Sequence, residues 1–291
     1  MIGLRLLICL SVLVGVPTHA LAEVHADSTV YTHTVKRWKR AIKTASFESS
    51  SWLWNLNFRD RHHKHGSRDS ILMVPDAAIP EDITLIVWFH GCNGFSERTF
   101  RKRIVPQMEA LVEEGNSVAI ALPELPWSTN TDTRCKRQGR VWRSAGALEK
   151  YVSSLRGQLK MWAQIKHGTE LGQVHLVFVG HSAGGSALMS AAAEGGLCRL
   201  APEAVIWSDA SYGHWLDKAW RSCLSRLDAE LHVLVRKWNK PYHSAQRVMK
   251  RARRTPHASR IFYQPLNGKY WSHTRIGDRA LLLTGFFPPG C

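Results

Sequence analysis

Short apolar runs recur along the chain from about residue 70, and segments with helical spacing separate them. Several runs, such as residues 83–89, do not alternate with polar residues, which is typical of strands buried on both faces. The predicted strands cover residues 71–74, 83–89, 117–122, 174–179, 204–207, 231–235 and 260–263. The predicted helices cover residues 28–48, 100–114, 141–167, 186–193, 214–229, 242–254 and 276–283. This alternation predicts an α/β fold, with a mostly parallel sheet covered by helices on both faces.

Residues 1–22 have the pattern of a secretory signal peptide. A short basic start precedes the apolar run 6–16, and small residues stand before the expected cleavage site. The run is shorter than the roughly 20 apolar residues that a membrane-spanning helix needs, so we expect cleavage rather than retention as an anchor. The protein is then exported to the periplasm or the extracellular space. In this interpretation residues 23–69 are a basic N-terminal extension, and residues 70–291 form a single domain.

The composition fits a globular protein, but the charge is strongly positive. Of the 291 residues, 44% are apolar and 21% are charged, which excludes wholesale disorder. Lys and Arg number 39 against 23 Asp and Glu, a formal net charge of +16. Residues 231–272 hold ten Lys and Arg and no acidic residue. Such a surface favours an anionic membrane or cell-envelope partner, with a simply solvated basic face as the alternative. Nucleic acid is not expected, because no recognised binding module accompanies the charge.

Removal of Cys9 with the signal peptide leaves five cysteines, an odd number. Two disulfides and one free thiol are the simplest arrangement in an exported protein, and the sequence leaves the pairing open. No spacing of Cys and His residues indicates a zinc site. The tract that contains His62, His63 and His65 is expected to be a solvated polar loop, with weak metal binding as the alternative. We therefore predict no metal site.

The most specific chemical signal is Gly180-His181-Ser182-Ala183-Gly184, a G-x-S-x-G motif between a buried strand and a helix of small residues. A nucleophilic serine on a sharp strand-to-helix turn needs small neighbours, because strand and helix approach closely there. Ser182 is therefore the candidate nucleophile. The backbone N–H of Ala183, at the start of the helix, is a candidate oxyanion donor.

On this motif, and on His90-Gly91-Cys92 after an earlier predicted strand, the chain resembles the α/β-hydrolase superfamily. The resemblance covers essentially the whole mature chain from about Ser70 onward and implies an α/β-hydrolase fold. It also implies that the loop after that earlier strand supplies the second oxyanion donor, which we assign to the N–H of Cys92. His90 and Gly91 of this loop, with Tyr212 and Trp271 of two later loops, are the candidate substrate-binding residues.

A narrower resemblance is carried by the same His-Gly-Cys element and by Ser-Ala-Gly-Gly at the nucleophile. In these residues the chain is similar to secreted polyhydroxybutyrate depolymerases and feruloyl-type esterases. That resemblance implies a disulfide between Cys92 and Cys135. Cys198 and Cys223 would then pair with each other, on either side of the strand 204–207.

A serine nucleophile needs a general base, and in the superfamily the base is a histidine that follows the acid in the chain. His273 follows the last predicted strand and precedes the C-terminal helix. It lies in a predicted loop over residues 270–274, from which the imidazole can reach inward. His257 precedes that strand and lies at the wrong end of the sheet. We therefore assign His273 as the base, with a structural histidine as the alternative.

The acid that orients the base is assigned by elimination. The usual position follows the strand 231–235, but no Asp or Glu occurs there before the base. Asp209 directly follows the preceding strand, where some α/β-hydrolases place their acid, and there it would fix the tautomer of the histidine. The remaining candidates are Asp217 and Asp228 on a predicted helix, which we expect to be solvated, and Asn239, a weaker alternative.

Together these assignments predict an exported serine hydrolase that cleaves a carboxylic ester, small or polymeric, through an acyl-enzyme intermediate and without a cofactor. The same residues could serve an amidase, a peptidase or an acyltransferase acting on a cell-envelope component, because the fold does not distinguish these reactions. A non-catalytic envelope-binding protein on a hydrolase scaffold is a further alternative. The presence of all three of Ser182, Asp209 and His273 argues against it.

Overall fold

The computed structural model describes residues 51–59, 67–92, 99–125 and 135–287, and the strands of this part form one eight-stranded sheet. The strands are β1 (Ser51–Arg59), β2 (Ser67–Pro75), β3 (Asp82–Phe89), β4 (Val118–Pro123), β5 (Gln173–His181), β6 (Ala204–Ser208), β7 (Glu230–Arg236) and β8 (Ile261–Leu266). Their order across the sheet is β1-β2-β4-β3-β5-β6-β7-β8. β2 is antiparallel to both of its neighbours, and all other neighbouring strands are parallel.

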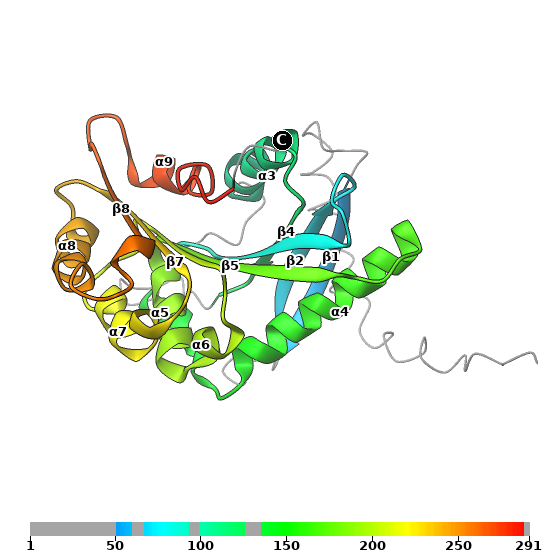
Figure 1. Ribbon diagram of the computed structural model, residues 1–291, viewed down its shortest axis with the longest axis horizontal. Coiled ribbons are helices and arrows are strands. Elements are labelled where there is room, and N and C mark those ends of the chain that lie inside the picture. Colours follow the sequence, from blue (N-terminus) through cyan, green and yellow to red (C-terminus); the bar gives the residue numbers. More distant parts are fainter. Residues whose placement is uncertain (1–50, 60–66, 93–98, 126–134, 288–291) are drawn as a thin grey trace, which may run out of the picture.

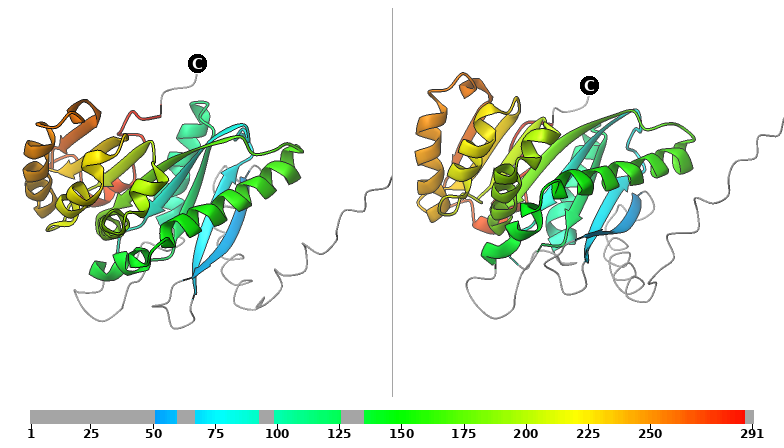
Figure 2. Two further views of the ribbon diagram at one scale, coloured as in Figure 1. Left: turned by 60° about the horizontal axis from the view of Figure 1, so that its bottom comes forward. Right: turned by 90° about the horizontal axis from the view of Figure 1, so that it is seen from below.

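Helices cover both faces of the sheet (Figures 1 and 2). They are α3 (Val105–Glu113), α4 (Ala147–His167), α5 (Gly185–Glu194), α6 (Gly196–Leu200), α7 (Trp215–Ser222), α8 (Lys240–Ala252) and α9 (His273–Gly277). α3 and α9 lie on one face, and α4 to α8 lie on the other (Figure 1). Successive residues of β3 alternate between two apolar cores, with Trp88 in the core under α3 and Phe89 in the core under α4 and α5. The predicted fold class is thereby confirmed.

All seven predicted strands are present, and β1 is a strand that the sequence did not predict. Each of its nine residues pairs with a residue of β2, so the sheet begins before the boundary predicted at residue 70. The division into an extension over 23–69 and a domain over 70–291 stays a prediction. The signal peptide 1–22, the helix 28–48 and the histidine tract lie outside the described residues.

Three helix predictions were wrong in their extent. The helix predicted over 141–167 is divided, because Gly146 adopts a left-handed conformation (φ 69°) between a 3-10 helix that ends at Arg143 and the start of α4. The helix predicted over 214–229 ends at Ser222. The helix predicted over 276–283 instead covers His273–Gly277, because the Ser272 side chain accepts a hydrogen bond from the Arg275 N–H and caps an earlier start.

A disulfide joins Cys198 to Cys223, which confirms one pairing implied by the narrower resemblance. It links the middle of α6 to the residue after α7 and so brackets β6. Cys92 is also disulfide-bonded. The side chain of Cys135 lies outside the described part, so its pairing with Cys92 stays a prediction. Among the described helices, none combines the length and the apolar character that crossing a membrane requires.

We expect the variant Cys198→Ala/Cys223→Ala to lose about 3 kcal/mol of unfolding free energy, because a link between residues 25 apart in the sequence restricts the unfolded chain. Urea denaturation of the variant and of the oxidised wild-type protein measures the difference. Equal transition midpoints and slopes would show that this bridge does not contribute to stability.

Candidate active site

The candidate site residues gather at one edge of the sheet, where the parallel strands have their carboxyl ends. Ser182 follows β5, Asp209 follows β6, and His273 opens α9 after β8. The loop that begins at His90 follows β3. In open α/β sheets this edge is the usual place of ligand binding, because loops from several neighbouring strands converge there.

Ser182 stands on a strained turn between β5 and α5. Its φ is 55°, in the left-handed region that a residue with a Cβ rarely adopts. The turn is possible because glycines flank it. A Cβ on Gly184 would overlap the backbone carbonyl of Phe89, and one on Gly185 would overlap that of Ala210. Ser182 remains partly exposed, whereas Ala183 is buried at the start of the 3-10 helix Ser182–Gly184, where the first N–H groups have no partner within the helix.

Asp209 and His273 form a direct hydrogen bond, 2.7 Å from Nδ1 to Oδ2. The carboxylate can only accept, so the imidazole donates from Nδ1, and in the neutral ring Nε2 keeps its lone pair. The His273 side chain is about one-third exposed and Asp209 is fully buried. The structure therefore pairs the two residues that the sequence assigned as base and acid, although His273 is the first residue of α9 and not part of a loop.

The buried carboxylate of Asp209 has partners on both oxygens. The Asn239 amide donates to Oδ1 at 3.0 Å and to Oδ2 at 3.1 Å, and the backbone N–H of Arg236 donates to Oδ1 at 3.2 Å. The same Asn239 accepts a hydrogen bond from the Tyr242 N–H through Oδ1 and caps α8. Asn239 is thus not a substitute for the acid but a residue that holds it, a role that sequence reasoning missed.

A second histidine, His181, packs against His273. Its ring stacks on that of His273 with 4.8 Å between centroids, and its Nδ1 donates to the Ser208 carbonyl at 3.1 Å. Burial holds the pKa of His181 well below its usual value, and the positive charge of Arg103, then that of His273 when protonated, lowers it further. His181 therefore stays neutral beneath the ring of His273 and fixes the plane in which that ring lies. Sequence reasoning assigned no role to His181, although its position inside the G-x-S-x-G motif, directly before Ser182, indicated that it lies near the nucleophile.

Tyr212 contacts both Ser182 and His273. Its phenol lies near the Ser182 side chain, and its ring lies edge-on to His273 with centroids 6.4 Å apart. Burial raises the pKa of Tyr212, the negative charge of Asp209 raises it further, and the neighbouring Ser182 hydroxyl opposes both. The phenol is therefore neutral near pH 7. A substrate-binding role for Tyr212 and for Trp271, which is partly buried under the guanidinium of Arg275, stays a prediction.

The loop after β3 lies against the nucleophile, since a Cβ on Gly91 would lie 3.0 Å from the Cβ of Ser182. His90 is fully buried, and its Nε2 accepts a hydrogen bond from the Leu125 N–H at 3.0 Å. The neutral ring therefore carries its proton on Nδ1, which donates to the Gly91 carbonyl at 2.6 Å. These contacts do not support the predicted substrate contact of His90, because no surface of its side chain is accessible. Instead they fix the loop that presents Cys92.

Contacts from α3 and the residues just before it, on the same face of the sheet, hold the segment that carries His273. Gln107 of α3 is buried, donates to the Gly277 carbonyl at 3.2 Å and accepts from the Leu281 N–H at 2.8 Å. Arg103 forms an ion pair with Asp278 at 2.8 Å. In the described residues, no group of three or more His, Cys, Asp or Glu side chains is arranged to hold a metal ion.

Comparison with known proteins identifies the fold but not a close relative. Neither a scan against protein-family models nor a search of curated proteins finds a match. An IroE-like serine hydrolase from Shewanella oneidensis is 13% identical, with a TM-score of 0.50 over 79% of this chain and 78% of that chain. A mutant of the feruloyl esterase module from Clostridium thermocellum, complexed with sinapinate, is 12% identical, with a TM-score of 0.50 over 82% and 89%. The chain therefore has the α/β-hydrolase fold, and its chemistry has to be argued from its own residues.

The contact between α9 and His181 gives a stability prediction. A Cβ on Gly277 would lie 2.6 to 2.8 Å from three atoms of the His181 ring, which is buried and cannot move aside. We expect Gly277→Ala to lower the unfolding free energy by about 1–3 kcal/mol. Gly157→Ala is the control, because its Cβ would meet nothing within 4 Å on the exposed side of α4, and we expect a gain of up to about 1 kcal/mol. Thermal unfolding of both variants measures these shifts, and a Gly277→Ala protein as stable as wild type would contradict the packing.

Proposed function

We propose that this protein is a serine hydrolase that cleaves a carboxylic ester. The observation that supports the proposal most directly is the hydrogen bond between buried Asp209 and His273 beside a serine on a strained strand-to-helix turn. Asp209 holds the imidazole in the tautomer whose Nε2 can accept a proton. Ser182 is the nucleophile, and no metal or cofactor takes part in this proposal.

In the first half of the reaction, the Ser182 oxygen attacks the ester carbonyl carbon while its proton passes to Nε2 of His273. The carbonyl oxygen becomes an oxyanion, and the N–H groups of Ala183 and Cys92 stabilise it. His273 then donates its proton to the departing alkoxide, which leaves as an alcohol. The acyl group stays bonded to the Ser182 oxygen. Asp209 stabilises the charged imidazolium between these two transfers.

In the second half, water attacks the acyl group and gives one proton to His273, which returns it to the Ser182 oxygen as the acid is released. His181 cannot replace His273 as the base, because its Nδ1 is bonded to the Ser208 carbonyl and its ring is buried.

We also propose that the protein works outside the cytoplasm. The Cys198–Cys223 disulfide supports an oxidising compartment, because such bonds are rare where thiols are kept reduced. The basic start and apolar run at the N-terminus point the same way.

Fluorophosphonate labelling tests the nucleophile. We expect stoichiometric labelling of wild-type protein and none of Ser182→Ala, with kcat/KM for p-nitrophenyl esters lower in the variant by a factor on the order of 10^5. Ser154→Ala is the matched control, because that hydroxyl lies on the exposed side of α4 and donates to the Lys150 carbonyl. Ser154→Ala should label and turn over as wild type does. A folded wild-type protein that resists labelling would contradict the proposal.

Asn239 gives a second test, because it both holds Asp209 and caps α8. We expect Asn239→Ser and Asn239→Ala each to lower kcat by about tenfold or more, since both remove the amide donor to a charged group. A serine can still cap the helix, so Asn239→Ala alone should lose about 1 kcal/mol of further unfolding free energy. Esterase kinetics and urea denaturation measure the two effects separately. Unchanged kcat in both folded variants would show that Asp209 needs no such support.

A further inference from the structure

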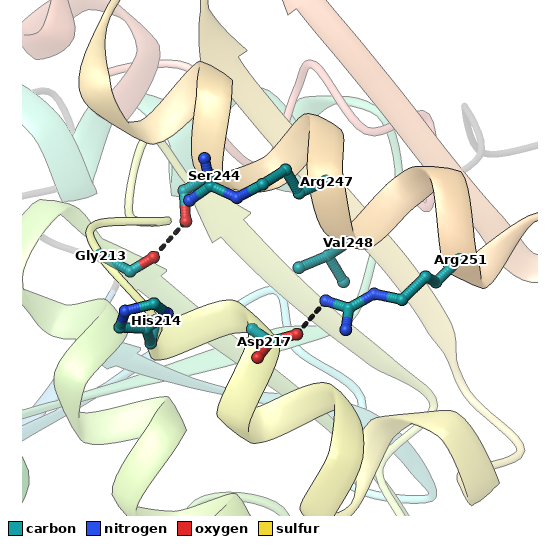
Figure 3. A pocket seen from close by; sticks show the side chains of 7 residues that line it. All are labelled: Gly213, His214, Asp217, Ser244, Arg247, Val248 and Arg251. Atoms are coloured by element: carbon teal, nitrogen blue, oxygen red, sulfur yellow. Dashed lines mark hydrogen bonds and ion pairs between the residues drawn. The ribbon is translucent and has the colours of Figure 1, made fainter.

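A pocket of about 380 Å³ lies between α7 and α8, directly beyond the loop that carries Asp209 and Tyr212. Figure 3 shows its lining, which comprises Gly213, His214, Asp217, Ser244, Arg247, Val248 and Arg251. The Ser244 hydroxyl donates to the Gly213 carbonyl and so ties α8 to this loop. No step of the reaction proposed above uses these residues.

Positive charge exceeds negative charge around the pocket. Asp217 is the one acidic residue of the lining, and it forms ion pairs with both Arg221 and Arg251. One carboxylate is therefore shared by two guanidinium groups. The third guanidinium, that of Arg247, has no carboxylate partner within the described part of the chain. Within the lining itself, two guanidinium groups stand against one carboxylate, so positive charge is in excess beside a cavity large enough for a small organic group.

The arginines are also arranged to act on one ligand. Arg247 and Arg251 are four residues apart on α8 and therefore lie on one face of the helix. Their side chains extend in the same direction, toward Gly213 and Asp217, with Val248 between them (Figure 3). A guanidinium group presents a planar pair of donors that matches the two oxygens of a carboxylate or phosphate. The valine offers an apolar surface for the carbon atoms next to such a group.

The pocket wall includes the residues that directly follow Tyr212 in the chain. The ring of Tyr212 packs on both His273 and Trp215, so the loop that carries it contacts the candidate base and also leads into the pocket lining at Gly213 and His214. This shared loop connects the pocket to the candidate reaction centre.

We propose that this pocket binds an oxyanion, a carboxylate or a phosphate, carried by the ester substrate. The natural substrate is then an ester with an acidic group on its acyl or alcohol part, and Arg247 is the principal contact of that group. The inference rests on the proposed ester hydrolysis, and it adds the chemical class of the substrate.

Matched ester pairs test this substrate class. p-Nitrophenyl monoesters of dicarboxylic acids of increasing length are compared with the neutral esters of equal chain length. We expect the acidic ester to have the higher kcat/KM at one length, and Arg247→Gln to reduce that preference about tenfold. Lys250→Gln is the control, because it removes the same charge from an exposed position of α8 outside the pocket lining. No preference at any length, or an equal loss in Lys250→Gln, would overturn the proposal.

Calorimetric titration with inorganic phosphate separates this inference from the proposed function. Saturable binding to wild-type protein that is lost in Arg247→Gln and kept in Lys250→Gln supports the oxyanion site, even if no ester is cleaved and the proposed function fails. Hydrolysis of neutral esters without phosphate binding and without acidic preference would overturn this inference alone. Phosphate binding without any preference for acidic esters would also overturn it, since the site would then serve a free anion and not the substrate.

Discussion

The buried carboxylate of Asp209 is the interaction on which the arrangement of the site depends. A charge without solvent contact is costly unless hydrogen bonds replace the lost water. Here the replacements come from the end of β7, from the loop before α8 and from the first residue of α9. The chain has to bring three separate segments to one carboxylate, and in doing so it positions the imidazole of His273 against His181, the residue before Ser182.

Strain is concentrated at the same edge of the sheet. Four described residues other than glycine have positive φ, and among them are Ser182, Asp209 and Trp238, each directly after a strand or within three residues of one. Such conformations persist only where surrounding contacts impose them. At Ser182 the close approach of Gly184 and Gly185 to neighbouring backbone supplies those contacts, and at Asp209 the hydrogen bonds to its carboxylate do so. The rigid two-core sheet thus holds a serine hydroxyl and an imidazole in an orientation that the local sequence alone would not favour.

The sequence predicts well what depends on local pattern. Buried apolar runs define seven of the eight strands, and the G-x-S-x-G motif together with the absence of acidic residues after β7 leads to Ser182 and Asp209. β1 was missed because its one apolar run, residues 52–54, is only three residues long, and polar residues interrupt the rest of Ser51–Arg59. The cap of α8 could have been predicted from Asn239 followed by Pro241, a common start of a helix.

What the sequence does not predict are contacts between distant segments. The bond from Gln107 to Gly277 spans 170 positions, and nothing in either segment indicates the other. The stacking of His181 on His273 is likewise a contact between segments far apart in the sequence. The backbone partners of His90 are of the same kind: both of its ring nitrogens are bonded to backbone groups, and a histidine in a loop after a strand does not indicate this by itself.

The central claim is that Ser182, His273, Asp209 and the two N–H groups form one preorganised site. A crystal structure of the protein after reaction with a fluorophosphonate tests it most directly. The phosphorus should be bonded to the Ser182 oxygen, with Nε2 of His273 within hydrogen-bond distance of that oxygen and the Asp209–His273 bond intact. The phosphoryl oxygen should face the N–H groups of Ala183 and Cys92. An adduct on another residue, or a phosphoryl oxygen pointing to solvent, would contradict the claim.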